Sequence, residues 1–146
     1  MPDSGIRTVS HRLAYYQVHG APRSNQCAAA VRAALNAPMQ GLASAADVWH
    51  AVPSHQRRRT HAPRGAIVYW TGGSSGYGHT CFALGDHLEL SVDVVPGKPG
   101  AAGVVPFSWF EAHWPRLTYA GWSWWWGAID TRDTQLIAQP APTTAA

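Results

Sequence analysis

Apolar residues recur at helical spacing in two segments in the first third of the chain. Residues 26–37, QCAAAVRAALNA, are dense in alanine, valine and leucine, which predicts a helix. Residues 44–52, SAADVWHAV, predict a second, shorter helix, with Ser44 as the N-cap and Asp47 at the third helical position, as in a capping box. A polar loop over residues 52–65 then ends the helical part of the chain.

The pattern then changes to the β-branched, aromatic and alternating type that is typical of strands. Four segments predict strands, namely 66–70, 79–85, 87–95 and 117–129. A tight turn at Gly85–Asp86 joins the second segment to the third, and residues 105–114 predict a short helix. Helices that precede an antiparallel sheet indicate an α+β fold.

The length of 146 residues fits one domain, which we place at residues 1–130. The remainder, 131–146, is rich in proline, alanine and threonine and predicts a disordered tail or a linker. The start of the chain lacks the apolar run of a signal peptide, and no stretch reaches the length of a membrane span. We therefore expect a protein made in the cytoplasm, which another agent must release if it acts outside.

The net charge is +3 with histidine neutral, and only 13% of the residues are charged. The one basic run is QRRRTH at 56–61, and Lys98 is the single lysine. A nucleic-acid partner would need more cations spread along a face, so we do not expect one. A mild positive charge suits an anionic polymer such as a bacterial cell wall.

The first candidate nucleophile is Cys27, at or next to the start of the first predicted helix. The free N–H groups and the dipole of a helix start stabilise a thiolate, and the same N–H groups could hold the oxyanion of an acyl-transfer intermediate. The alternative interpretation is a small residue that packs among alanines. Position alone leaves both interpretations open.

The segment SGYGHTCFALGD, residues 75–86, holds His79 after a glycine-rich loop and Cys81 two positions later. The two share a strand face, but Cα atoms at this spacing are about 6.5–7 Å apart, which makes a direct hydrogen bond awkward. We therefore expect Cys81 to pack in the core and His79 to act as the base for Cys27. A Cys27–Cys81 disulfide and a zinc site on these three residues remain alternatives, although the spacing matches no strong zinc motif.

On the third predicted strand, alternation places Glu89, Ser91 and Asp93 on one face and apolar residues on the other. The antiparallel turn brings residues 91–94 opposite His79. Asp93, or Ser91 in its place, can then hydrogen-bond the imidazole and fix its tautomer.

Alternation also places three tryptophans on one face of the last predicted strand, namely Trp122, Trp124 and Trp126. They either close the core or form an aromatic surface that stacks on sugar rings.

Three segments that follow the helix-borne cysteine carry a resemblance: PRGAIVYW at 63–70, GYGHTCFALGD at 76–86 and ELSVD at 89–93. In this order the chain resembles the NlpC/P60 and CHAP superfamily of papain-like cysteine peptidases and amidases, over about residues 20–125. The segment NQCAAA is closer to the CHAP motif than to the D-C-S-G of NlpC/P60, and Thr80 stands where valine is commoner.

The resemblance implies a papain-like α+β fold, in which the helix that bears the nucleophile packs on the antiparallel sheet that bears the base. Carried over by motif, Cys27 is the nucleophile and His79 the base, with Asp93 as the orienting residue and Ser91 as its substitute. The expected substrate contacts are Trp70, Tyr77 and Gly78. The implied activity is hydrolysis of peptide or amide bonds in bacterial peptidoglycan, with no metal or other cofactor.

Members of this superfamily are often phage lysins or secreted enzymes that remodel the wall. We therefore expect a role in phage lysis or in a virion or tail assembly. The alternative is a non-catalytic module of the same fold, which binds the wall or has a structural role in the virion and uses the tryptophans.

Overall fold

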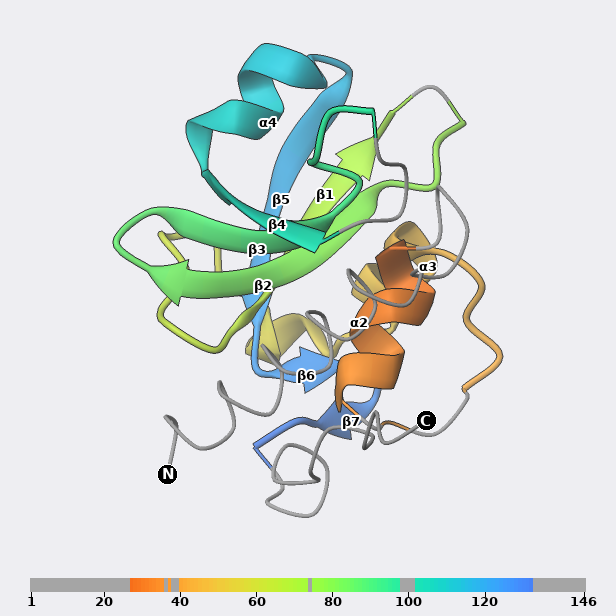
Figure 1. Ribbon diagram of the computed structural model, residues 1–146. Helices are drawn as coiled ribbons and strands as arrows, with labels where there is room; N and C mark the ends of the chain where they lie inside the picture. Colours follow the sequence, from red (N-terminus) through yellow and green to blue (C-terminus); the bar gives the residue numbers. More distant parts are fainter. Residues whose placement is uncertain (1–26, 36, 38–39, 74, 98–101, 133–146) are drawn as a thin grey trace, which may run out of the picture.

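The computed structural model describes residues 27–35, 37, 40–73, 75–97 and 102–132. The helices are α2 (Cys27–Leu35), α3 (Ala45–Ala51), the single 3-10 turn η1 (Ser54–Gln56) and α4 (Ser108–His113). The strands are β1 (Ile67–Gly72), β2 (His79–Gly85), β3 (Leu88–Val92), β4 (Ala102–Pro106), β5 (Leu117–Ser123), β6 (Trp125–Trp126) and β7 (Ile129–Asp130). Figure 1 shows their arrangement.

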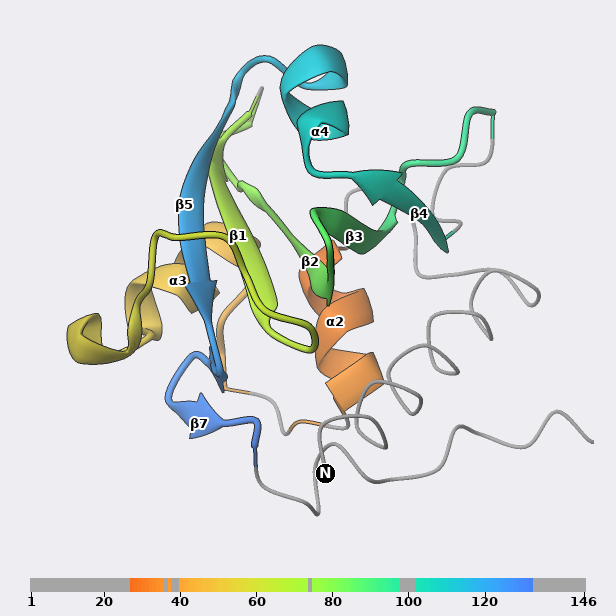
Figure 2. The same ribbon diagram turned by 90° about the vertical axis from the view of Figure 1, so that its left-hand side faces the viewer.

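The strands β4, β3, β2, β1 and β5 form, in this order, one sheet in which every neighbouring pair is antiparallel. Helix α2 packs on β2 and α3 on β1, and both contribute to the same apolar layer on one face of the sheet (Figure 2). The short strands β6 and β7 pair with each other as a separate hairpin. The predicted α+β class, with helices packed on an antiparallel sheet that follows them, is confirmed.

Both faces of β1 are covered, which explains its sequence. Ile67 and Tyr69 belong to the apolar cluster under α2 and α3, whereas Val68 and Trp70 belong to the cluster around Phe110 of α4. The run from Ile67 to Trp70 is therefore buried at every position. A strand that is covered on both faces reads as a continuous apolar run, without alternation.

Two local predictions can be compared with the structure directly. The side chain of Ser44 accepts a hydrogen bond of 3.2 Å from the backbone N–H of Asp47, so the predicted N-cap of α3 is confirmed. The predicted hairpin between β2 and β3 is also present, but its turn lies one residue later. Asp86 and His87 have φ of 52° and 59°, and a two-residue hairpin turn requires positive φ at both positions.

The single long strand predicted over residues 117–129 is wrong. Strand β5 ends at Ser123, where the hydroxyl accepts a hydrogen bond of 3.1 Å from the N–H of Trp125 and donates one of 2.6 Å to its carbonyl. A serine side chain that bonds to the backbone two residues ahead replaces the partners that a continuing strand would supply. The chain therefore bends after β5 and forms the β6–β7 hairpin.

The helix predicted over residues 105–114 is only partly right. Val104 and Val105 belong to β4 and pair with Leu90 and Glu89 of β3, and the helix begins at Ser108. Without β4, one edge of β3 would lack hydrogen-bond partners over most of its length. Pairing across the sheet therefore prevails over the helical spacing of the local sequence.

The described structure continues to residue 132, just past the predicted domain boundary at residue 130. Thr131 is buried, and its backbone N–H donates a hydrogen bond of 2.8 Å to the carbonyl of Trp124. The rest of the predicted tail, 133–146, and residues 1–26 of the predicted domain lie outside the described residues. Within the described part of the chain, no helix has both the length and the apolar character needed to cross a membrane.

Candidate active site

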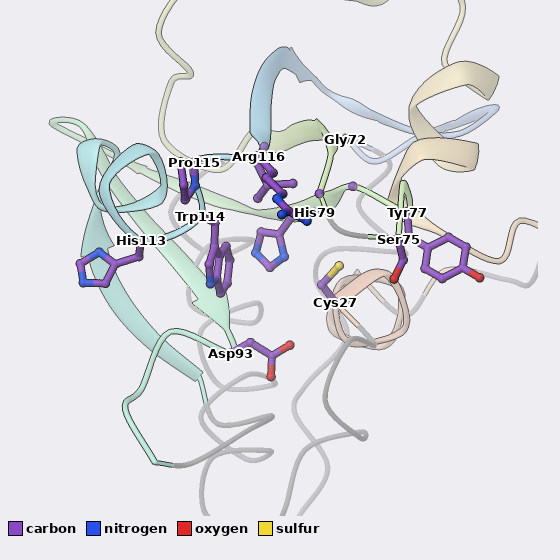
Figure 3. Close-up of a pocket in the computed structure, with 13 residues that line it drawn as sticks. Cys27, Gly72, Ser75, Tyr77, His79, Asp93, His113, Trp114, Pro115 and Arg116 are labelled. Atoms are coloured by element: carbon purple, nitrogen blue, oxygen red, sulfur yellow. The ribbon is translucent and has the colours of Figure 1, made fainter.

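Cys27, His79 and Asp93 line one pocket with a volume of about 470 Å³. They come from three different places in the fold: the first residue of α2, the first residue of β2 and the residue after β3. Figure 3 shows the sulfur of Cys27, the imidazole of His79 and the carboxylate of Asp93 around the same space. The structure thus brings together all three residues that the sequence singled out for chemistry.

Cys27 is a free thiol, 6% exposed, at the start of a nine-residue helix. Burial, together with a smaller contribution from the nearby charge of Asp93, raises the pKa of its thiol from 9.0 to about 11. Backbone hydrogen bonds from Thr80, Ala28 and Cys27 itself act in the opposite direction. These backbone N–H groups therefore favour the charged form of the thiol, against the effect of burial.

His79 is held at one ring nitrogen by Ser91. Its Nε2 lies 2.7 Å from the Ser91 Oγ, and that hydroxyl donates its own proton to the carbonyl of Val92 at 2.8 Å. A serine hydroxyl has one proton to give, so with that proton on Val92 the oxygen must accept from His79. The hydrogen-bond network therefore assigns the proton to Nε2 and leaves Nδ1 as the basic nitrogen.

Two aromatic rings lie beside the His79 imidazole. The ring centroids of Phe110 and Trp114 lie 5.5 Å and 5.0 Å from that of His79. Burial lowers the pKa of His79 to about 3. Since the pKa of Cys27 is raised in the same pocket, the thiol and the imidazole are both neutral near pH 7 in the unliganded protein.

The contact expected of Asp93 is made by Ser91, which the sequence analysis kept as its substitute. Strand β3 ends at Val92, and Asp93 has a φ of 66°, in the left-handed region that aspartate tolerates better than most residues. Alternation along the strand therefore no longer applies at residue 93. Asp93 lines the pocket as a nearby negative charge for Cys27, and Ser91 lies beneath the imidazole.

Tyr77 and Gly78, two of the expected substrate contacts, also line the pocket. Tyr77 is 65% exposed at its rim, while its carbonyl accepts a hydrogen bond of 2.9 Å from the N–H of Ala46 in α3. Gly78 has a φ of 71°, and a Cβ added there would lie 2.4 Å from the carbonyl oxygen of Trp70. The glycine is thus required by the close approach of two backbone segments, which places His79 at the start of β2.

Trp70, the third expected substrate contact, does not line the pocket. It pairs with His79 across β1 and β2, is 3% exposed, and packs against Phe107, Phe110 and Tyr119. Its buried indole N–H lies near enough to the Cys81 sulfur to lower the pKa of that thiol, and it has no nitrogen or oxygen partner among the described residues. Trp70 therefore belongs to the core and pairs with His79 through the backbone, without facing the pocket.

Cys81 is a second free and buried thiol, so the alternative of a Cys27–Cys81 disulfide does not hold in this structure. Its sulfur lies 3.8 Å from Oε2 of Glu89 on the neighbouring strand. Burial raises the pKa of Cys81, and the carboxyl of Glu89 raises it further. Among the described residues, no group of three or more histidine, cysteine, aspartate and glutamate side chains is arranged to hold a metal ion.

The tryptophans of the C-terminal segment do not share one face. Trp126 is 3% exposed and stacks on Tyr69 in the cluster beneath α2 and α3, whereas Trp122 and Trp124 contact each other beside the opposite cluster. The indole N–H of Trp122 donates to the hydroxyl of Thr60 at 3.3 Å. These contacts favour the core-closing interpretation over a sugar-stacking surface.

One wall of the pocket does not follow from the sequence pattern. This wall runs from the last residue of α4 to the link before β5 and consists of His113, Trp114, Pro115 and Arg116. In the sequence, residues 113–116 read only as the link between a predicted helix and a predicted strand. A short link that combines an imidazole, an indole and a guanidinium would have been a usable signal, since functional side chains concentrate on such links.

No protein-family model matches this sequence, and a search of curated proteins returns no match. The likeness to cysteine peptidases therefore rests on the motifs quoted above, and the argument for an activity rests on the geometry of the pocket.

Proposed function

We propose that this protein is a papain-like thiol hydrolase that cleaves peptide or amide bonds of bacterial peptidoglycan. The observation that carries the proposal is the shared pocket of Cys27 and His79, in which Ser91 engages Nε2 and leaves Nδ1 free to take a proton. The substrate class comes from the resemblance and agrees with the net charge of +3.

In the proposed reaction, Nδ1 of His79 takes the thiol proton while the sulfur of Cys27 attacks the substrate carbonyl. The oxyanion of the tetrahedral intermediate accepts hydrogen bonds from backbone N–H groups at the start of α2. The protonated imidazole then gives its proton to the leaving amine, and a thioester remains on Cys27. A water molecule gives a proton to Nδ1 and attacks the thioester, which releases the acid and restores the thiol.

The neutral resting pair fits this sequence of steps. A lone thiolate or a lone imidazolium is unfavourable in so buried a site, as the pKa values of Cys27 and His79 indicate. The two charges form together and stabilise each other, because proton transfer creates them as a close pair. Proton transfer is therefore expected to accompany substrate binding and attack.

The same observation favours a second candidate, a non-catalytic module that binds the wall. The Cys27 thiol has a pKa of about 11 and is therefore mostly protonated at neutral pH. A pocket with an unreactive thiol also fits a module that binds the wall without cleaving it. This candidate predicts binding to walls with no chemical change in them.

The change Cys27→Ala distinguishes the two candidates. We expect it to abolish the release of soluble muropeptides from purified cell walls and to leave sedimentation of the protein with those walls unchanged. Cys81→Ala is the matched control, because it removes the other buried thiol without touching the pocket, and it should keep the activity. Undiminished release by Cys27→Ala would contradict the proposed nucleophile.

A further inference from the structure

Arg116 is a charged residue of the pocket that the proposed reaction does not use. Of the described residues that line the pocket, it is the only arginine or lysine. It is exposed, and its guanidinium makes no hydrogen bond or ion pair with any residue that the structure describes. Figure 3 shows Arg116 and Asp93 on opposite sides of His79 in that view.

Most other described arginines bond to the protein itself. Backbone carbonyls or a carboxylate accept hydrogen bonds from Arg32, Arg57, Arg58, Arg64 and Arg132. Arg59 is exposed and without such a bond, like Arg116, but it does not line the pocket. Arg116 thus combines an available guanidinium with a place in the candidate site.

The backbone of Arg116 is held firmly at the rim. Its carbonyl accepts a hydrogen bond of 3.1 Å from the N–H of Gly73, and the next residue, Leu117, pairs with Gly72 across β1 and β5. Gly72 has a φ of 89°, and a Cβ added there would lie 2.7 Å from the Arg116 carbonyl oxygen. The glycine turn therefore fixes where the arginine side chain starts.

Arg116 also lies close to the candidate chemistry. Trp114, two residues earlier, contacts the imidazole of His79 with 5.0 Å between ring centroids. Arg116 lies two residues after Trp114, which corresponds to about 7 Å of extended chain. An arginine side chain is long enough to cover this distance toward His79. A group on the substrate residue next to the scissile bond would be within its reach.

We infer that Arg116 binds a carboxylate on the substrate residue adjacent to the scissile bond, and that the site therefore prefers acidic peptides over their amidated forms. A guanidinium offers a planar pair of donors that matches a carboxylate, and a neutral carboxamide cannot replace the charge. The inference deepens the proposed function and rests on it for the position of the scissile bond.

The test measures binding without turnover, in a Cys27→Ala background. The probes are two synthetic peptides of the peptidoglycan-stem type, identical except for a carboxylate or a carboxamide on the residue next to the scissile bond. By calorimetry we expect the carboxylate peptide to bind roughly tenfold more tightly, as for one charge-assisted contact that remains partly solvated. Adding Arg116→Gln should make the two dissociation constants equal. In the parent with only Cys27→Ala, 1 M salt should reduce the ratio of the two dissociation constants.

The control is Arg59→Gln in the same background, which removes the same charge outside the pocket and should preserve the tenfold preference. An unchanged preference in Arg116→Gln would overturn the inference, as would equal binding of both peptides by the parent or no binding of either. If the preference is present but the protein with Cys27 intact cleaves neither peptide, the proposed hydrolase function fails and the carboxylate site stands.

Discussion

The surroundings of Cys27 and Cys81 differ more than the positions of the two residues in the sequence suggest. Both are buried free thiols whose pKa values are raised by burial. Cys27 begins a helix, lines a pocket and has backbone N–H groups directed at its sulfur. Cys81 lies inside a strand, is 1% exposed and has a carboxyl group as its sulfur's neighbour.

The difference shows that separation along the chain is a poor guide to which cysteine shares a pocket with His79. His79 is two residues from Cys81 in the sequence. The thiol of Cys81, however, is directed at the carboxyl group of Glu89 on the adjacent strand. Cys27 is far earlier in the sequence and shares the pocket with His79. A nucleophile needs access and hydrogen-bond donors for its charged form, and of these two cysteines it is Cys27 that has both.

The largest expected effect is selective alkylation of the two thiols. Iodoacetamide should modify Cys27 in the folded protein and leave Cys81 intact, because Cys81 becomes accessible only on unfolding, in about 10⁻³ to 10⁻⁶ of the molecules. The rate at Cys27 should rise about tenfold per pH unit between pH 7 and 10, since the thiolate fraction grows that way below a pKa of about 11. Peptide mapping by mass spectrometry measures both rates.

Urea provides the control for this experiment, because both thiols should react at similar rates in the unfolded chain. Faster modification of Cys81 than of Cys27 in the folded protein would reverse the comparison. A rate at Cys27 that is independent of pH in this range would show that its thiolate is already formed.

A smaller effect is expected from the two residues considered for orienting His79. Ser91→Ala removes the acceptor of the Nε2 proton and leaves a buried N–H without a partner, which should lower kcat about 10–100-fold. Asp93→Asn removes the charge that raises the pKa of Cys27, so kcat should stay within a few-fold. The measurement is the pH profile of muropeptide release by each variant.

Ser91→Thr serves as the conservative control, because it keeps the hydroxyl that His79 requires. It should restore most of the activity that Ser91→Ala loses, which a purely structural defect would not explain. Loss of activity in Asp93→Asn, with Ser91→Ala unaffected, would return the orienting role to Asp93.

The sequence was a good guide where local rules decide the structure. Apolar periodicity located α2 and α3, and the predicted N-cap at Ser44 was right to the residue. It also placed Cys27 at or next to the start of a helix and His79 at the first residue of a strand, as the structure has them. Each of these features depends on residues that lie within about ten positions of one another. Such short-range patterns can be read from one sequence alone.

Local rules failed where distant contacts decide. Trp70 was expected at the substrate but is held in the core by Phe107 and Tyr119, which follow it by dozens of residues. Alternation placed Asp93 beside Ser91, and the left-handed backbone at residue 93 changes its direction. The pocket wall around Trp114 depends on how α4 packs against β5, which no local pattern encodes.

The smallest expected effect concerns Glu89, the neighbour of Cys81. Burial raises the pKa of this carboxyl from 4.5 to about 8, so the folded protein keeps the proton that the unfolded chain loses. The stability that this provides is complete below pH 4.5 and is lost as the pH rises toward 8. His79 has the opposite dependence, because its lowered pKa costs stability as the pH falls from 6.5 toward 3.

The two effects oppose each other between pH 4.5 and 6.5, and above pH 6.5 only that of Glu89 remains. Urea unfolding should therefore show the free energy of unfolding falling by about 2 kcal/mol from pH 6.5 to 8. Glu89→Gln should remove that fall, because an amide keeps the same neutral form at every pH, whereas Cys81→Ala should retain it. If the fall persists in Glu89→Gln, the carboxyl beside Cys81 is ionised in the folded protein, and the two cysteine sites differ by a buried charge as well as by access.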